Sequence, residues 1–221
     1  DRPNDKPQEW LTRKRNEPGS VYEYNDVRVN VLALALTSIL RKPLPVFLKE
    51  KVMDPIGASD TWRWTGYRNS WIVLDGKQIQ SVSGGGHFGG GLFISAIDMA
   101  RFGLLALNNG NWNGQQIINS AFLNQATTTS QNINLAYGYL WWLNGKTSYR
   151  LPQTQLQFNG SLIASGANDM YMALGKDDQK IYVVPSKKMV VIRMGDAADS
   201  ANLALSTFDE VLWQKINALY Q

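Results

Sequence analysis

The sequence predicts an α+β protein in which an antiparallel sheet is flanked by helices, and three features of the chain indicate this. Residues 180–184 and 189–193 are apolar runs rich in Val and Ile, separated by only four residues. Strands so close in sequence pair antiparallel. Residues 200–221 carry apolar side chains at helical spacing, and such a helix must pack on something, most simply this sheet. Residues 27–40 are apolar around most of a helix circumference and predict a buried helix.

The first half of the chain predicts two further helices and a hairpin. A helix is expected over residues 45–53, because Pro55 follows it. A hairpin is expected over residues 71–81, where Asp75-Gly76 supplies the positive φ of a two-residue turn. The pattern Ser95-x-x-Asp98 is typical of a capping box, and apolar spacing extends that helix to Gly110.

The second half predicts a short helix, an aromatic strand and a long loop before the final sheet. These are expected over residues 120–125, 137–142 and 144–168, respectively. The last helix is predicted to turn one apolar face toward the sheet, formed by Phe208, Val211, Leu212, Ile216 and Leu219.

Composition narrows the function classes. The chain has 221 residues, of which 44% are hydrophobic and 18% charged, so we expect a single domain over residues 1–221, with 1–18 as an extended arm or loop.

The net charge of +4 is scattered, which argues against a nucleic-acid groove. No Cys and a single histidine, His87, make a metal centre improbable. No segment is apolar enough to span a membrane. The N-terminus resembles the interior of a longer chain.

A glycine-rich segment raises the possibility of a dinucleotide site. Residues 84–89 have the spacing Gly-x-Gly-x-x-Gly. A dinucleotide loop also needs a helix that opens within the glycines and an acidic residue about 20 positions later. Here residues 92–94 intervene before any helix cap, and residues 104–109 hold no acid. We therefore expect no bound dinucleotide, and a dinucleotide-dependent oxidoreductase is the least favoured function.

The usual serine nucleophile motifs are missing from residues 1–221. No serine has glycine two positions before and two after it, and no serine has lysine three positions later. A Ser-His-Asp triad would have to use His87.

Other stretches nevertheless resemble a known family. Residues 19–31, GSVYEYNDVRVNV, are similar to the Tyr-x-Asn region of the serine β-lactamase-related hydrolases, the superfamily of class C β-lactamases, DD-peptidases, esterases and 6-aminohexanoate-dimer hydrolases. Residues 44–57 resemble its helix that ends in Pro-(Leu/Ile)-Gly, and residues 89–103 its glycine stretch and following helix. Residues 171–185 resemble its third-motif strand and the strand after it. The resemblance covers roughly residues 18–220 and implies the β-lactamase/DD-peptidase-like fold, incomplete at its N-terminus.

The resemblance implies roles for four residues. Tyr24 would be the phenol that moves the proton to and from the nucleophilic serine, although a core aromatic is the alternative. Asp26 would contact substrate or simply cap the helix. His87 would lie near the tip of a glycine loop beside the substrate, or be only a hydrogen-bonded loop residue. Gly175 would end the third motif, with a neighbouring strand amide holding the oxyanion.

The sequence departs from the family pattern in three respects. The Ser-x-x-Lys segment would have to come from a separate or missing N-terminal piece, so this chain alone would be inactive. Asp26 stands where class C β-lactamases have Asn, which favours an ester, amide or peptide over the anionic β-lactams. Ala173 replaces a cationic or imidazole side chain, for which Lys176 would substitute unless it is simply a surface lysine. Trp62 and Trp64 would either pack in the core and hairpin or wall a hydrophobic acyl pocket.

Three wider expectations follow from the resemblance. It implies neither a metal nor an organic cofactor. A small-molecule ester or amide is the expected substrate, and a periplasmic or secreted location rests on analogy with the family. The main alternative is a catalytically inactive binding protein that keeps the fold.

Overall fold

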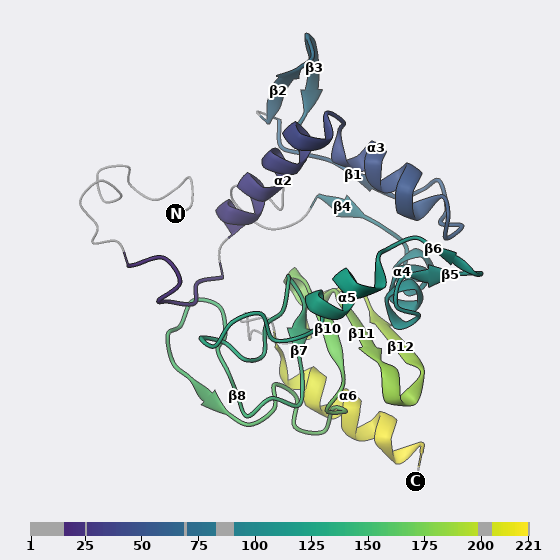
Figure 1. Cartoon of the computed structure of the whole chain (residues 1–221). Helices are drawn as coiled ribbons and strands as arrows, with labels where there is room; N and C mark the ends of the chain where they lie inside the picture. Colours follow the sequence, from purple (N-terminus) through teal and green to yellow (C-terminus); the bar gives the residue numbers. More distant parts are fainter. Residues whose placement is uncertain (1–15, 25, 69, 83–90, 199–204, 221) are drawn as a thin grey trace. The chain divides into compact units, whose positions relative to one another are not determined.

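The chain forms two compact units (Figure 1). The computed structural model describes residues 16–24, 26–68, 70–82, 91–198 and 205–220. The first unit comprises Asp1–Pro18 and Tyr24–Ser95, and the second comprises Gly19–Glu23 and Ala96–Gln221. The single domain expected over residues 1–221 stays a prediction. Most of the expected N-terminal arm lies outside the described residues.

Helices in the first unit follow the sequence closely. Helix α2 spans Asp26–Leu40 and α3 spans Leu44–Leu48, continuing as the π-helical turn η1 over Lys49–Met53. The α2 residue Ala33 packs with Leu44 and Val82 in a small apolar cluster. Helix α2 is apolar around most of its circumference, but only Ala33 and Thr37 of its described side chains are buried, so much of its apolar surface stays exposed.

Strands in the first unit form two short pairs. Strands β2 (Trp71–Leu74) and β3 (Lys77–Gln80) make the expected hairpin. Asp75 and Gly76 have φ values of 50° and 75°, as a turn with two positive φ angles requires. Strand β1 (Arg63–Trp64) pairs antiparallel with β4 (Leu92–Phe93).

The second unit is built on a four-stranded antiparallel sheet with the order β12-β11-β10-β7. Strands β11 (Lys180–Val184) and β12 (Met189–Arg193) coincide with the predicted pair, and β10 (Tyr171–Leu174) and β7 (Trp142–Leu143) extend it. Alternating side chains along these strands point to opposite faces. Both faces are therefore available to helices.

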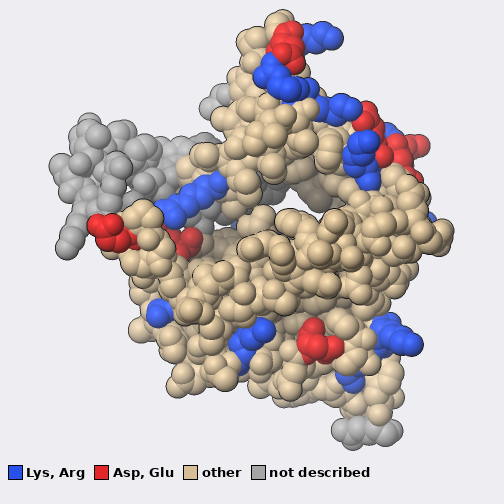
Figure 2. Space-filling view, in the orientation of Figure 1, with Lys and Arg blue, Asp and Glu red and all other residues tan. Residues whose placement is uncertain are grey.

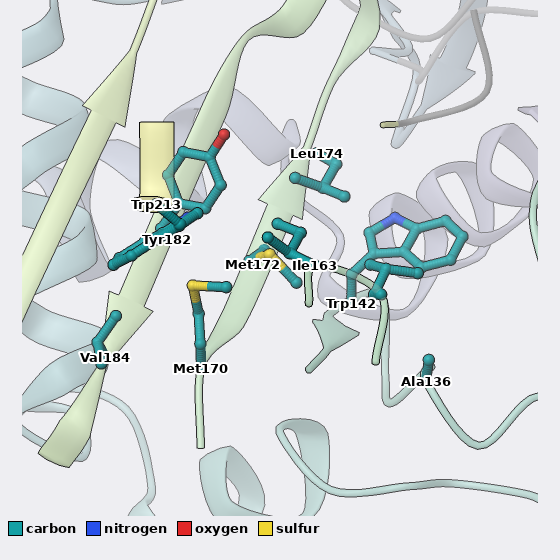
Figure 3. Packing of buried hydrophobic residues seen from close by; sticks show 10 residues of the cluster. Ala136, Trp142, Ile163, Met170, Met172, Leu174, Tyr182, Val184 and Trp213 are labelled. Atoms are coloured by element: carbon teal, nitrogen blue, oxygen red, sulfur yellow. The ribbon is translucent and has the colours of Figure 1, made fainter. Parts of the chain in front are cut away.

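Helices cover both faces of this sheet, which confirms the α+β prediction. On one face, α6 (Thr207–Ala218) contributes Trp213 to a cluster with Trp142, Met172 and Tyr182 (Figure 3). On the other face, α4 (Ala96–Leu107) and α5 (Ser120–Ala126) pack against a second cluster. The members of this second cluster are Ala106, Leu123, Leu143, Tyr171, Ile181 and Val183.

Two small hairpins complete the second unit. Strand β5 (Asn111–Trp112) pairs with β6 (Gln115–Gln116), directly after α4. Strand β8 (Ser148–Tyr149) pairs with β9 (Phe158–Asn159), so the predicted loop over residues 144–168 contains a short ordered hairpin.

One local prediction was wrong, and another was right only in part. The stretch 137–142 is not one strand, because it reverses between Tyr137 and Trp142, which form a bridge with each other. The buried face of α6 agrees in part, since Leu212 and Ile216 pack against the cluster on the sheet as predicted, whereas Val211 and Leu219 are exposed and Trp213 is fully buried. Bulky apolar side chains lie on neighbouring faces of this helix, so the sequence alone does not identify the buried face. Packing against the cluster on the sheet determines which side chains are buried.

Candidate functional site

The C-terminal end of β10 extends beyond its pairing with β7. Gly175 donates its N–H to the carbonyl of Gln179 at 2.8 Å, on the β11 side. Because backbone groups alternate along an antiparallel strand, the N–H of Leu174 points away from β11. Strand β7 pairs with β10 only at Tyr171 and Met172. The outward amide of Leu174 therefore lies past the end of this pairing.

The turn after Gly175 is tightly held. It contains the 3₁₀ turn η2 (Lys176–Asp178), with positive φ at Asp177 and Asp178. The Arg193 guanidinium on β12 donates to the carbonyls of Asp177 and Asp178 at 3.2 and 3.3 Å, respectively. Gln179 adds a hydrogen bond from the Gly195 N–H to its side-chain oxygen at 3.1 Å. These bonds fix the backbone just beyond the third-motif region.

A buried charge cluster lies beneath this turn. Lys180 is fully buried, and its Nζ lies 2.7 Å from Asp178 Oδ1 and 2.5 Å from Asp209 Oδ2. Asp209 also accepts hydrogen bonds from the Tyr182 hydroxyl at 2.5 Å and from the Ser206 N–H at 2.8 Å. Asp209 thus joins the N-terminus of α6 to strand β11. We call these five residues the Lys180 cluster.

The interaction with Lys180 keeps Asp178 ionised. Burial alone would raise the pKa of the Asp178 carboxyl, but hydrogen bonds from Lys180 and from the Ala198 N–H outweigh it, and the pKa is lowered. The Ala198 N–H donates to Asp178 Oδ2 at 2.9 Å. The cluster therefore also secures the chain after β12.

Sequence reasoning missed the Lys180 cluster. Lys180 was treated only as part of an apolar strand, and Asp209 lies 29 positions away in sequence. One signal was available, since Ser206-x-x-Asp209 is a capping box and the structure contains it. That signal predicts the helix start but not the buried lysine.

Buried tyrosines predict a loss of stability at high pH. Burial raises the pKa of Tyr171 to about 12, and the Asp169 charge adds to the rise. Burial and the Asp209 charge likewise raise the pKa of Tyr182. An unfolded tyrosine titrates near pH 10. Because the folded state holds these protons more tightly, stability should be intact below about pH 10 and fall as pH rises above it, by up to roughly 1.4 kcal/mol per pH unit for each tyrosine.

Thermal melts followed by circular dichroism between about pH 9 and about pH 11 check this. Tyr171→Phe should show a shallower decline than the wild-type chain, because one of the two titrating groups is gone. An equal decline in both would contradict the assignment.

The first unit holds Tyr24 and the backbone of Asp26. Tyr24 lies two residues before α2, as the resemblance implies, and is 37% exposed. It is therefore not a buried core aromatic. Asp26 begins α2, but its side chain lies outside the described part of the chain, as does all of His87 and the glycine loop. Gly175 belongs to the second unit, and the site roles of Tyr24, Asp26, His87 and Gly175 stay predictions.

Trp62 and Trp64 line a hollow in the first unit. Its volume is about 240 Å³, and its other walls come from Pro45, Val46, Lys49, Asp60 and Arg63. Three charged side chains border this hollow, but most of its lining surface is apolar, so an acyl pocket walled by the two tryptophans stays a prediction. The Lys49 ammonium lies 2.5 Å from Asp54 Oδ1, and this hydrogen bond raises the pKa of Lys49.

The described residues also bear on metal binding and on membrane insertion. No group of three or more His, Cys, Asp or Glu side chains there could hold a metal ion. Within the same residues, no single helix is both long and apolar enough to cross a membrane. Only the pair Val27–Leu40 and Leu44–Met53, bent by 73°, reaches that length and composition together.

Comparisons with known proteins agree with the resemblance. The family model described as Beta-lactamase matches residues 4–205. A solved structure described as a 6-aminohexanoate-dimer hydrolase from Bacillus anthracis is 23% identical, with a TM-score of 0.61 over 94% of this chain. A structure described as a beta-lactamase from Bacteroides dorei DSM 17855 is 13% identical, with a TM-score of 0.57 over 96% of this chain. A penicillin binding protein from Bacillus halodurans is 16% identical, with a TM-score of 0.54 over 95% of this chain.

These matched structures are longer than the present chain. The chain covers 45% of the hydrolase from B. anthracis, 62% of the protein from B. dorei and 60% of the protein from B. halodurans. No sequence among curated proteins matches the chain. At these identities the structural likeness establishes the fold.

Proposed function

Because the chain belongs to the beta-lactamase family, we propose that it is the larger part of a serine hydrolase that acts through an acyl-enzyme. The observation that carries this proposal is the family match over residues 4–205. The substrate carbonyl would be that of an ester, amide, peptide or β-lactam. An anionic Asp26 near the substrate would repel the carboxylate of a β-lactam, which favours esters and amides.

The chain's own residues would supply proton transfer and oxyanion binding. The exposed phenol of Tyr24 would take the proton from the attacking serine and return it to the leaving group. The outward N–H of Leu174 is better oriented than that of Gly175 to hold the oxyanion, because the Gly175 N–H is bonded to Gln179. Gly175 would then allow the strand to turn, and Asp26 and His87 would contact the substrate.

The nucleophilic serine and its lysine would come from a part of the protein outside residues 1–221. Two observations support this. The chain contains no Ser-x-x-Lys and spans 45% of the matched hydrolase. In addition, α2 exposes large apolar side chains, a face suited to a covering apolar segment. These side chains are Val31, Leu32, Leu34, Leu36, Ile39 and Leu40.

A catalytically inactive binding protein is the second candidate function. The Ala at position 173, where the family has Lys or His, favours it. In that case the covering segment would lack the serine or the lysine. A periplasmic or secreted location would suit either function.

Labelling with a fluorophosphonate probe tests the proposal. The protein would be isolated from its natural source through a tag on the C-terminus of this chain, and its intact mass measured with and without probe. We expect one probe adduct on a polypeptide that contains this chain or co-purifies with it. A lone 24.8 kDa species that never takes up the probe would instead support the inactive binding protein.

A further inference from the structure

A long segment of the second unit is uncharged. Residues 102–145 contain no Asp, Glu, Lys, Arg or His, although 18% of the whole chain is charged. This segment includes α5 and the reversal before β7. Figure 2 accordingly shows an uncharged surface over α5. A charged ligand would lose its hydration here without gaining a counter-ion from this segment.

Three large apolar side chains of this segment lie at the surface. Phe122 on α5 is 55% exposed, and Tyr139 and Leu140 at the reversal are 49% and 53% exposed. The rings of Phe122 and Tyr139 lie 6.2 Å apart between centroids. We call these three residues the apolar platform.

The platform is held by backbone contacts. Gly138 donates its N–H to the carbonyl of Trp141 at 2.9 Å, which closes a turn with Tyr139 and Leu140 at its tip. Tyr139 donates its N–H to the carbonyl of Ala126, at the end of α5, also at 2.9 Å. A Cβ added at Gly138 would lie 2.1 Å from that same carbonyl oxygen, so only glycine fits this close approach.

Leu140 is strained in this turn. Its φ is 64°, in the left-handed region that glycine and asparagine adopt far more readily than leucine. A half-exposed leucine gains little burial to offset that strain. Strained residues of this kind cluster at functional sites, where a particular side chain is needed. The fold itself would accept glycine at this position.

Strand register places the platform beside the C-terminal end of β10. Trp142 pairs with Met172, and the two strands are antiparallel. The residues before Trp142 therefore run alongside the residues after Met172. Trp141 and Ala173 accordingly pack against the same apolar cluster. The turn at Tyr139 and Leu140 thus lies at the end of β10 that carries the outward amide of Leu174.

We propose that the apolar platform binds an uncharged alkyl or aryl group of the substrate, next to the carbonyl that reacts. This inference rests on the proposed function for its choice of substrate, and it deepens that function. An ester or amide would bind if the substituent that faces the platform is uncharged and apolar. The same molecule with a carboxylate on that substituent would bind more weakly.

The test is a binding titration that needs no turnover. The 221-residue chain is titrated with N-butylhexanamide and with an analogue whose hexanoyl chain ends in a carboxylate, and tryptophan fluorescence is followed. Trp141 directly follows Leu140 but is one of eight tryptophans in the chain, so the fluorescence measures affinity and the variants below locate the site. We expect the neutral amide to bind at least about 10-fold more tightly than the anion. Equal affinities would overturn the proposal.

Three variants locate the binding site. Leu140→Gly should weaken binding of the neutral amide about 5-fold or more while raising the melting temperature, because glycine relieves the positive φ. Phe122→Ser should weaken binding comparably. Leu156→Ser, at another exposed leucine (67% exposed), should leave the affinity unchanged. Unchanged affinity in Leu140→Gly and Phe122→Ser, or a platform occupied by a second copy in sedimentation experiments, would contradict the proposal.

These outcomes separate the inference from the proposed function. Platform-dependent binding together with a failure to label by fluorophosphonate would support the platform and contradict the hydrolase. Successful labelling, together with unchanged ligand affinity in the platform variants, would support the hydrolase and contradict the platform.

Discussion

Replacing Asp209 with alanine is expected to lower the free energy of unfolding of the second unit by roughly 3–5 kcal/mol. The carboxylate accepts from Lys180 Nζ, the Tyr182 hydroxyl and the Ser206 N–H, all of them buried. Its loss would leave Lys180 with one carboxylate in place of two and remove the Asp209 half of the capping box of α6. Truncating one member of a buried charge network costs far more than deleting an exposed pair, because the remaining charge cannot regain its hydration.

Urea unfolding followed by circular dichroism measures this change. The matched control is Glu50→Ala, which removes a carboxylate 2.7 Å from Lys42 Nζ in a pair whose side chains are 45% and 39% exposed. That variant should change stability by no more than about 1 kcal/mol. A similar small effect for Asp209→Ala would mean that the Lys180 cluster is not buried as described.

A second large effect is expected at Tyr24. In the complete protein, Tyr24→Phe should slow fluorophosphonate labelling about 10²–10⁴-fold, because the phenol oxygen that moves the serine proton is removed while the ring stays. The rate of labelling measures this directly. Tyr220→Phe, at an exposed tyrosine near the C-terminus (64% exposed), serves as the control and should label at the wild-type rate. An unchanged rate in Tyr24→Phe would remove the catalytic role of Tyr24.

Elements with strong local signals were predictable from the sequence. Asp75-Gly76 fixes its hairpin because both residues tolerate positive φ. The pair β11 and β12 was predicted to the residue, since β-branched residues fill both strands and four residues separate them. Tyr24 ahead of α2 was likewise expected from the family motif. In each case the determining contacts lie within a few residues in sequence.

Elements set by distant contacts were not predictable. Tyr139-Leu140 has no turn-forming residue, and its reversal depends on the carbonyl of Ala126 and on the pairing of β7 with β10. The burial of Lys180 depends on Asp209, which becomes its neighbour only when α6 packs on the sheet. Neither contact could be inferred from the spacing of residues in the sequence. The turn at Tyr139-Leu140 and the Lys180 cluster are also the features that contribute most to fixing the C-terminal end of β10.

The most direct test of the account is to locate the fluorophosphonate on the labelled protein by peptide mass spectrometry. We expect the label on a serine outside residues 1–221, followed three positions later by lysine, with the rate of modification dependent on Tyr24. A label on any serine within residues 1–221 would contradict the proposed division of the catalytic residues between this chain and the rest of the protein.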